Sequence, residues 1–227
     1  FGRCLAHFTM DKDEVFFTTK LNRDKTFFMP FNKGLPNGRG AGNPVNTTGG
    51  YKTSYMWEQI LQKDNVADII MNYVLFDYGE AKTQKKVAHV MKNAKKLIFP
   101  RYHQLDVVEK LIADTKARTE GRNYLLQHSA GSGKSNSIAW LTYRLASLHN
   151  DLDKEMFQTV FVVTDRRVLN SQLQATVLGF EHLEGQIETI TDKDNSSKLK
   201  DAINDKKRII ITTLHRFPLI YQQLDEH

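Results

Sequence analysis

The chain has 227 residues, of which 40% are apolar and 26% are charged, and its formal net charge is +6. This length suffices for one large or two small domains, and the composition excludes disordered, collagen-like and membrane-spanning classes. The single cysteine, Cys4, rules out an internal disulfide and favours a cytoplasmic location. We expect Cys4 to be a small buried hydrophobe. Neither an initiator Met nor a signal peptide opens the sequence, so we expect a piece of a longer protein.

The first 50 residues predict an antiparallel meander followed by a connector. Three short runs rich in aromatic and β-branched residues are separated by polar turns, which is typical of hairpin-linked strands. The runs cover residues 4–10, 14–20 and 26–29. Residues 32–50 are rich in Gly, Asn and Pro and predict a long loop. Loops of this length in compact proteins are usually functional or disordered.

Residues 51–98 change to helical periodicity. Apolar side chains three and four positions apart predict three amphipathic helices. Their apolar faces contain Tyr55, Met56, Ile60 and Leu61; Val66, Ile69, Ile70, Tyr73 and Val74; and Val87, Val90, Met91, Ala94 and Ile98. The third helix is basic, since residues 81–105 contain no Asp or Glu. Its lysines, among them Lys85, Lys92 and Lys96, form either a solvated face or a patch that binds DNA phosphates.

From residue 99 onward, predicted strands and helices alternate. Apolar runs predict strands at residues 123–127, 159–164, 186–191 and 208–213. We expect the second and the last of these to be buried on both faces, because their apolar residues are nearly continuous. Helices are predicted at residues 134–148, through Ile138, Leu141, Leu145 and Leu148, and at residues 196–204. The alternation predicts an α/β fold with a parallel sheet and right-handed crossovers.

A phosphate-binding loop precedes the helix at residues 134–148. The loop reads Ala130-Gly131-Ser132-Gly133-Lys134-Ser135, and His128 stands where such loops usually open with glycine. Glycines allow backbone conformations that other residues avoid, and the start of a helix favours an anion. We expect Lys134 to contact the β and γ phosphates of ATP and the Ser135 hydroxyl to coordinate Mg²⁺.

Gln104 and Arg101, upstream of this loop, are candidates for contacting adenine. An amide carries both a donor and an acceptor, which suits the two-faced edge of that base. The alternative is that Gln104 caps the start of a helix. The apolar face of this helix would contain Leu105, Val108, Leu111 and Ile112.

Polar residues also mark the ends of two later strands. Asp165 and Arg166 follow one apolar run, and Thr212 and Thr213 end another. In open parallel sheets, the residues that bind ligands lie at the carboxyl ends of the strands. We therefore expect these four residues to contact the DNA backbone, together with the lysines of the basic helix.

These motifs resemble those of superfamily 2 helicases, and in detail they resemble the R subunit of type I restriction-modification systems. The motor strings are His128-Ser129-Ala130-Gly131-Ser132-Gly133-Lys134-Ser135, then Phe161-Val162-Val163-Thr164-Asp165-Arg166-Arg167 with Leu169 and Gln172, then Thr212-Thr213 with Phe217. The N-terminal strings are Leu5-Ala6-His7-Phe8, Thr18-Thr19-Lys20-Leu21, Phe28-Met29-Pro30-Phe31-Asn32-Lys33-Gly34 and Gly40-Ala41-Gly42-Asn43-Pro44. The similarity covers nearly the whole chain.

The resemblance implies both an architecture and an activity. Residues 1–50 would be the end of a nuclease domain with its connector, residues 51–98 a helical basic linker, and residues 99–227 an incomplete RecA-like motor lobe. The family's activity is that of an ATP- and Mg²⁺-dependent type I site-specific deoxyribonuclease, which translocates double-stranded DNA and cleaves it. Its partners are the methyltransferase and specificity subunits of the same system, and no membrane is involved.

The acidic residues that this family uses for catalysis are not visible in the sequence. We interpret Leu224-Asp225-Glu226-His227 as a surface end and not as the acidic Walker B box, because the preceding residues are too polar for a buried strand. Glu80-Ala81-Lys82, with Asp68 or Asp77 upstream, matches the nuclease string only by a short and frequent pattern. We therefore assign no catalytic residue, and we expect these 227 residues alone to bind nucleotide without hydrolysing it.

Two alternatives stay open. Another superfamily 2 protein, such as a type III restriction subunit or a repair helicase, would share the motor motifs but not the N-terminal meander and its connector. A nucleotide-binding module that has lost hydrolysis would keep the phosphate-binding loop without an acidic partner.

Overall fold

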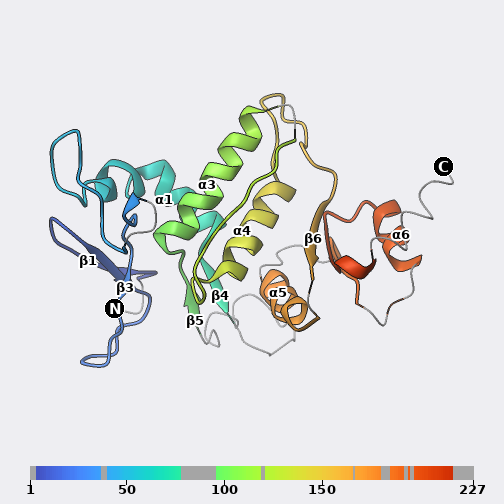
Figure 1. Cartoon of the computed structure of the whole chain (residues 1–227), viewed down its shortest axis with the longest axis horizontal. Helices are drawn as coiled ribbons and strands as arrows, with labels where there is room; N and C mark the ends of the chain where they lie inside the picture. Colours follow the sequence, from blue (N-terminus) through green and yellow to red (C-terminus); the bar gives the residue numbers. More distant parts are fainter. Residues whose placement is uncertain are drawn as a thin grey trace. The chain divides into compact units, whose positions relative to one another are not determined.

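A computed structural model of the chain describes residues 4–36, 40–77, 96–118, 121–165, 167–179, 185–191, 194 and 197–216. The chain divides into two compact units, Phe1–Val107 and Val108–His227. The division falls within helix α3 (Tyr102–Ala117), and both units are drawn in Figure 1. The first two predicted zones, residues 1–50 and 51–98, both lie in the first unit.

The first unit begins with a three-stranded antiparallel sheet. Strands β1 (His7–Met10), β2 (Val15–Thr18) and β3 (Met29–Pro30) pair in sequence order, which confirms the predicted meander. Aromatic side chains form its core: Phe17 and Phe31 are fully buried, and their ring centroids lie 5.6 Å apart. Such edge-to-face pairs add to the stabilisation that apolar burial provides.

The connector at residues 32–50 is held against this sheet by two asparagine side chains. The Asn32 carboxamide oxygen accepts hydrogen bonds from the Val15 N–H (2.8 Å) and the Asn43 Nδ2 (2.9 Å). Asn43 is buried; its Nδ2 also donates to the Asp13 carbonyl (3.0 Å), and its Oδ1 accepts from the Lys33 N–H (2.8 Å). The described part of the connector is therefore an ordered structure and not slack.

Two helices follow the connector, as the periodicity of residues 51–74 predicts. They are η2 (Met56–Ile60), a π-helical turn, and α1 (Lys63–Asn72). The buried positions agree only in part with the predicted faces. Met56, Ile60, Ile69 and Tyr73 are buried, whereas Leu61 and Ile70 are exposed.

The predicted helix that ends at Ile98 is wrong at its carboxyl end, and its other residues lie outside the described part of the chain. Lys96–Ile98 is strand β5, which pairs antiparallel with β4 (Leu75–Asp77). Strand pairing decides the conformation of a segment this short, whatever its local spacing suggests. The prediction that Cys4 is buried is also wrong, because Cys4 is exposed and precedes β1.

The second unit contains a parallel three-stranded sheet. Strands β6 (Val160–Thr164), β7 (Ile187–Thr189) and β8 (Ile209–Thr213) lie in the order β6-β8-β7. Helices α5 (Arg167–Gly179) and α6 (Ser197–Asn204) make the crossovers. This arrangement confirms the α/β fold and the last three predicted strands, and it has the parallel sheet of an incomplete RecA-like lobe.

Burial differs between the strands of this sheet. Strand β8 is central and every one of its residues is buried, as predicted. Strand β6, also predicted to be buried on both faces, lies at the edge, and its Phe161 and Val163 are 39% and 42% exposed. The correction has a simple cause: an apolar run indicates a strand, but only the strand order decides which strand is enclosed.

Helix α4 (Lys134–Ala146) packs against α5 and against β6 and β8. It confirms the helix predicted after the phosphate-binding loop. Its fully buried anchor is Trp140, beside Ala139, whereas Ile138, which the periodicity placed on the inner face, is 40% exposed. Among the described residues, no helix has the length and apolar character that crossing a membrane requires.

Candidate nucleotide-binding site

The loop at residues 128–133 has the backbone conformation that its two glycines predict. Gly131 has a φ of 73° and Gly133 a φ of 81°, both in the left-handed region that residues with a Cβ rarely adopt. A Cβ added at Gly131 would meet nothing within 4 Å. Backbone conformation, and not crowding, therefore requires glycine at this position.

Helix α4 begins directly after this turn, with Gly133 as its N-cap residue. No side chain caps the helix, and its first turn contains no acidic residue. The first N–H groups of a helix have no partner within the helix, and the helix dipole adds partial positive charge there. The start of α4 is therefore suited to an anion such as a phosphate group.

The Lys134 side chain folds back over the loop. Its Nζ donates to the Ser129 carbonyl at 2.8 Å and to the His128 carbonyl at 3.2 Å. These bonds hold an exposed ammonium group against the loop that precedes the helix. A point charge on a flexible stem can exchange carbonyl partners for phosphate oxygens.

The remaining loop residues differ in exposure. Ala130 is exposed, Ser135 is partly exposed and Ser132 is buried. Within the described residues, no three His, Cys, Asp or Glu side chains are grouped so that they could hold a metal ion. The residues present fit a magnesium ion that arrives with nucleotide phosphates, because the Ser135 hydroxyl is an oxygen ligand of the kind that Mg²⁺ takes.

The strand predicted at residues 123–127 is absent. Residues 121–127 are exposed, with Leu125 at 94%, and no described strand pairs with them. The segment is instead attached to α3: the Tyr124 hydroxyl donates to Asp114 Oδ2 at 2.6 Å, and Arg118 Nε donates to Asp114 Oδ1 at 2.8 Å. The Tyr124 hydroxyl, followed by the Arg118 guanidinium, lowers the pKa of Asp114.

Gln104 lies at the start of α3 and is buried. Its Oε1 accepts a hydrogen bond from the Arg101 N–H at 2.9 Å, which is half of a capping box. The capping role is therefore present. The adenine contact of Gln104 and Arg101 stays a prediction, because these residues belong to the first unit and the phosphate-binding loop to the second.

The predicted DNA contacts have varied surroundings. Asp165 is exposed after β6, whereas the side chains of Thr212 and Thr213 are buried at the carboxyl end of β8. Lys96 is exposed at the start of β5. Arg166, Lys85, Lys92 and the strings at residues 80–82 and 224–227 lie outside the described residues. All of these contacts stay predictions.

Comparison with protein families assigns the second half of the chain. The family model described as SWI2/SNF2 ATPase matches residues 103–227, which include the whole phosphate-binding loop. The chain belongs to the SWI2/SNF2 ATPase family. Searches of curated proteins and of solved structures returned no match.

Membership of this family confirms the coarser part of the resemblance. The chain is a superfamily 2 helicase-like ATPase, and the nucleotide binding predicted for residues 128–135 agrees with that assignment. The family match does not distinguish the R subunit of a restriction system from other members.

Sequence reasoning missed one arrangement in the first unit. The Lys33 ammonium lies 4.8 Å from the ring centroid of Tyr55 and 6.0 Å from that of Tyr102. These residues are far apart in the sequence and follow no common motif. The one hint in the sequence was the number of Asn and Gly residues around Lys33. Such residues indicate an ordered loop, but they do not show which side chains the loop packs against.

Proposed function

We propose that this chain is part of the R subunit of a type I restriction-modification system, an ATP-dependent translocase and endonuclease of double-stranded DNA. The observation that carries the ATP-dependent part is the loop Gly131 to Ser135, whose glycine conformations and helix start suit phosphate groups. Support for the finer assignment comes from the aromatic meander and the glycine-rich connector, which occur in one chain with the ATPase stretch.

In this proposal each residue of the loop has a defined task. The N–H groups at the start of α4 and the Lys134 ammonium bind the β and γ phosphates, and the Ser135 hydroxyl binds the magnesium ion. The bound ion would neutralise charge on the phosphates during transfer to water. Lys134 is the residue best placed to sense the nucleotide, because its Nζ would give up the Ser129 carbonyl to reach a phosphate.

The R-subunit assignment predicts a specific assembly. The full-length protein that contains this chain should co-purify with the methyltransferase and specificity subunits encoded with it. The assembled complex should displace a triplex-forming oligonucleotide from duplex DNA only with ATP, and Lys134→Ala should abolish displacement but not assembly. The exposed Lys154→Ala should behave like the unmodified protein. Failure to assemble with either subunit would contradict the assignment.

The non-hydrolysing module remains the second candidate, because no carboxylate cluster that could hold Mg²⁺ occurs among the described residues. Steady phosphate release separates the two. Release that is lost in Lys134→Ala supports the enzyme. Nucleotide binding without release from the full-length protein supports the module.

A further inference from the structure

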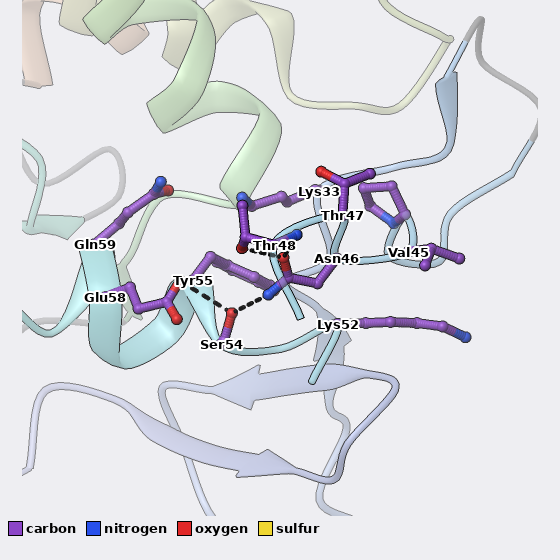
Figure 2. Close-up of a pocket in the computed structure, with 11 residues that line it drawn as sticks. Lys33, Val45, Asn46, Thr47, Thr48, Lys52, Ser54, Tyr55, Glu58 and Gln59 are labelled. Carbon is purple, nitrogen blue, oxygen red and sulfur yellow. Dashed lines mark hydrogen bonds between the residues drawn. The ribbon is translucent and has the colours of Figure 1, made fainter. Parts of the chain in front are cut away.

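A polar pocket of about 270 Å³ lies in the first unit, between the connector and the start of η2 (Figure 2). Its wall includes Lys33, Asn46, Thr48, Ser54, Tyr55 and Glu58. Pockets for whole small molecules usually measure about 300 to 1,000 Å³. This pocket is therefore sized for a small group or for one part of a larger ligand.

Lys33 supplies a positive charge that is fixed at both ends of the residue. Its backbone N–H donates to Asn43 Oδ1, and its Nζ lies over the ring of Tyr55. That ring is itself held, because Tyr55 is buried and its hydroxyl donates to the Phe31 carbonyl at 2.7 Å. Burial raises the pKa of the Tyr55 hydroxyl, so the ring stays neutral at physiological pH.

The Lys33 ammonium is half-buried and forms no ion pair with any carboxylate in the described part of the chain. Lys52, the other lysine of the wall, differs: its Nζ lies 2.9 Å from Asp13 Oδ1, and this hydrogen bond raises the pKa of Lys52. In Figure 2 the Lys52 side chain points away from Tyr55. Lys33 is therefore the cation of this wall that an incoming anion can neutralise.

The polar groups opposite are mostly engaged with one another. Asn46 Nδ2 donates to Ser54 Oγ at 2.9 Å, and Ser54 Oγ donates to Glu58 Oε2 at 3.0 Å. Asn46 Oδ1 accepts from the Thr48 N–H and hydroxyl. The wall is thus organised before any ligand arrives, which lowers the entropic cost of binding. Glu58 is exposed, so water screens its repulsion of an anion.

We propose that this pocket binds a phosphate group, with the Lys33 ammonium as its charged contact. Lysine and the hydroxyl and amide side chains around it are the groups that proteins use for phosphates. A cationic ligand would be repelled by Lys33, and an apolar one would leave the polar wall desolvated. The phosphate can belong to a nucleic-acid backbone or to a nucleotide. The pocket shares no residue with the loop at Gly131 to Ser135, and the proposal does not depend on the proposed function.

Two measurements on the full chain test the proposal and distinguish the two sources. The first is the affinity for a random-sequence DNA duplex as a function of salt, because each phosphate contact contributes about −0.9 to the slope of log K against log salt. The second is the rise in melting temperature with Mg-ATP in a Lys134→Ala background, where the loop at Gly131 to Ser135 no longer responds.

The main variant is Lys33→Gln, which should melt close to the unmodified chain without ligand, because it keeps the backbone bond to Asn43 and the bond from the Tyr55 hydroxyl to the Phe31 carbonyl. Lys33→Arg should still bind phosphate, because it keeps a positive charge over the ring of Tyr55. Lys25→Gln, exposed and outside the pocket, controls for the loss of one positive charge. Glu58→Gln should strengthen binding by less than about twofold, because water already screens the charge of Glu58.

The source is nucleic acid if Lys33→Gln makes the slope of log K against log salt for DNA less negative by about 0.9, the contribution of one phosphate contact. It is a nucleotide if Lys33→Gln removes the residual response to Mg-ATP. Either result supports a phosphate site. Unchanged DNA binding together with an unchanged Mg-ATP response would overturn the proposal, whether or not Lys134→Ala confirms the loop at Gly131 to Ser135.

Discussion

At the scale of single residues, the buried amide of Asn43 holds the connector against the first sheet. Asn43 makes three hydrogen bonds to two neighbouring segments from a position that is 5% exposed. Buried polar groups that lose a partner cost free energy, because the partner left behind is no longer solvated. Asn43 therefore links the connector and the sheet in a way that no apolar residue could replace.

This role of Asn43 leads to a stability prediction. Asn43→Ala should lower the free energy of unfolding by about 2 kcal/mol, since it leaves the Lys33 N–H and the Asp13 carbonyl without their partner. Urea unfolding measures the change. Asn22→Ala, at an exposed position, is the control and should change it by less than about 0.5 kcal/mol. Equal effects of the two substitutions would contradict this account of Asn43.

Residue chemistry could be predicted where a motif is local. Gly131, Gly133 and Lys134 follow each other in the sequence, so their backbone conformations and the helix start could be predicted together. Lys33 could not, because its partner rings come from residues 22 and 69 positions further along the chain. Gln104 shows a third case: a helix cap and an adenine contact require the same side chain, so spacing alone does not separate them.

At the scale of elements, the carboxylate of Asp194 is one of the groups that hold the connection between β7 and α6. Asp194 Oδ2 accepts from the hydroxyl and the N–H of Thr191 at 2.6 and 2.7 Å, and Asp194 Oδ1 lies 3.1 Å from Lys198 Nζ. The Thr191 hydrogen bonds, followed by Lys198, lower the pKa of Asp194 to about 2. The ionised carboxylate therefore joins the strand to the first turn of the helix.

The lowered pKa predicts a pH dependence. A carboxyl group whose pKa is lower in the folded chain contributes stability above its unfolded pKa, near 4, and loses it as the pH falls towards 2. Asp194→Asn should therefore unfold about 1 to 2 kcal/mol more easily at pH 7, and the difference should shrink between pH 4 and pH 2. Denaturant unfolding across this range measures it, with the exposed Asp201→Asn as the control. A difference that stays constant with pH would show that the charge of Asp194 is not responsible.

Elements could be predicted in type more reliably than in surroundings. The last three strands of the second unit and helices α4 and α6 follow from apolar periodicity. Periodicity does not reveal strand partners, which explains three errors: the missing strand at residues 123–127, the exposed edge strand β6, and β5 at the end of a predicted helix. In each case a non-local pairing, or its absence among the described strands, decided the outcome.

At the scale of the whole molecule, one chain joins two compact units of different construction. The first has antiparallel sheets and a pocket with an uncompensated lysine, and the second has a parallel sheet and a phosphate-binding loop. Residues 103–227 match the SWI2/SNF2 ATPase family. The family match does not cover the N-terminal sequence motifs. The proposed restriction subunit is the assignment that also accounts for them.

The central claim is that the loop at Gly131 to Ser135 binds the phosphates of ATP. The most direct test is the melting temperature of the full chain with and without Mg-ATP, compared with Lys134→Ala and the exposed control Lys154→Ala. At a hundredfold excess over the dissociation constant, ligand binding stabilises by about 2.7 kcal/mol, which for a chain of this size corresponds to roughly 5 to 10 °C. We expect that rise in the unmodified chain and in Lys154→Ala, and a much smaller one in Lys134→Ala, where at most the response of the Lys33 pocket remains. No rise in the unmodified chain, or the same rise in Lys134→Ala, would contradict the claim.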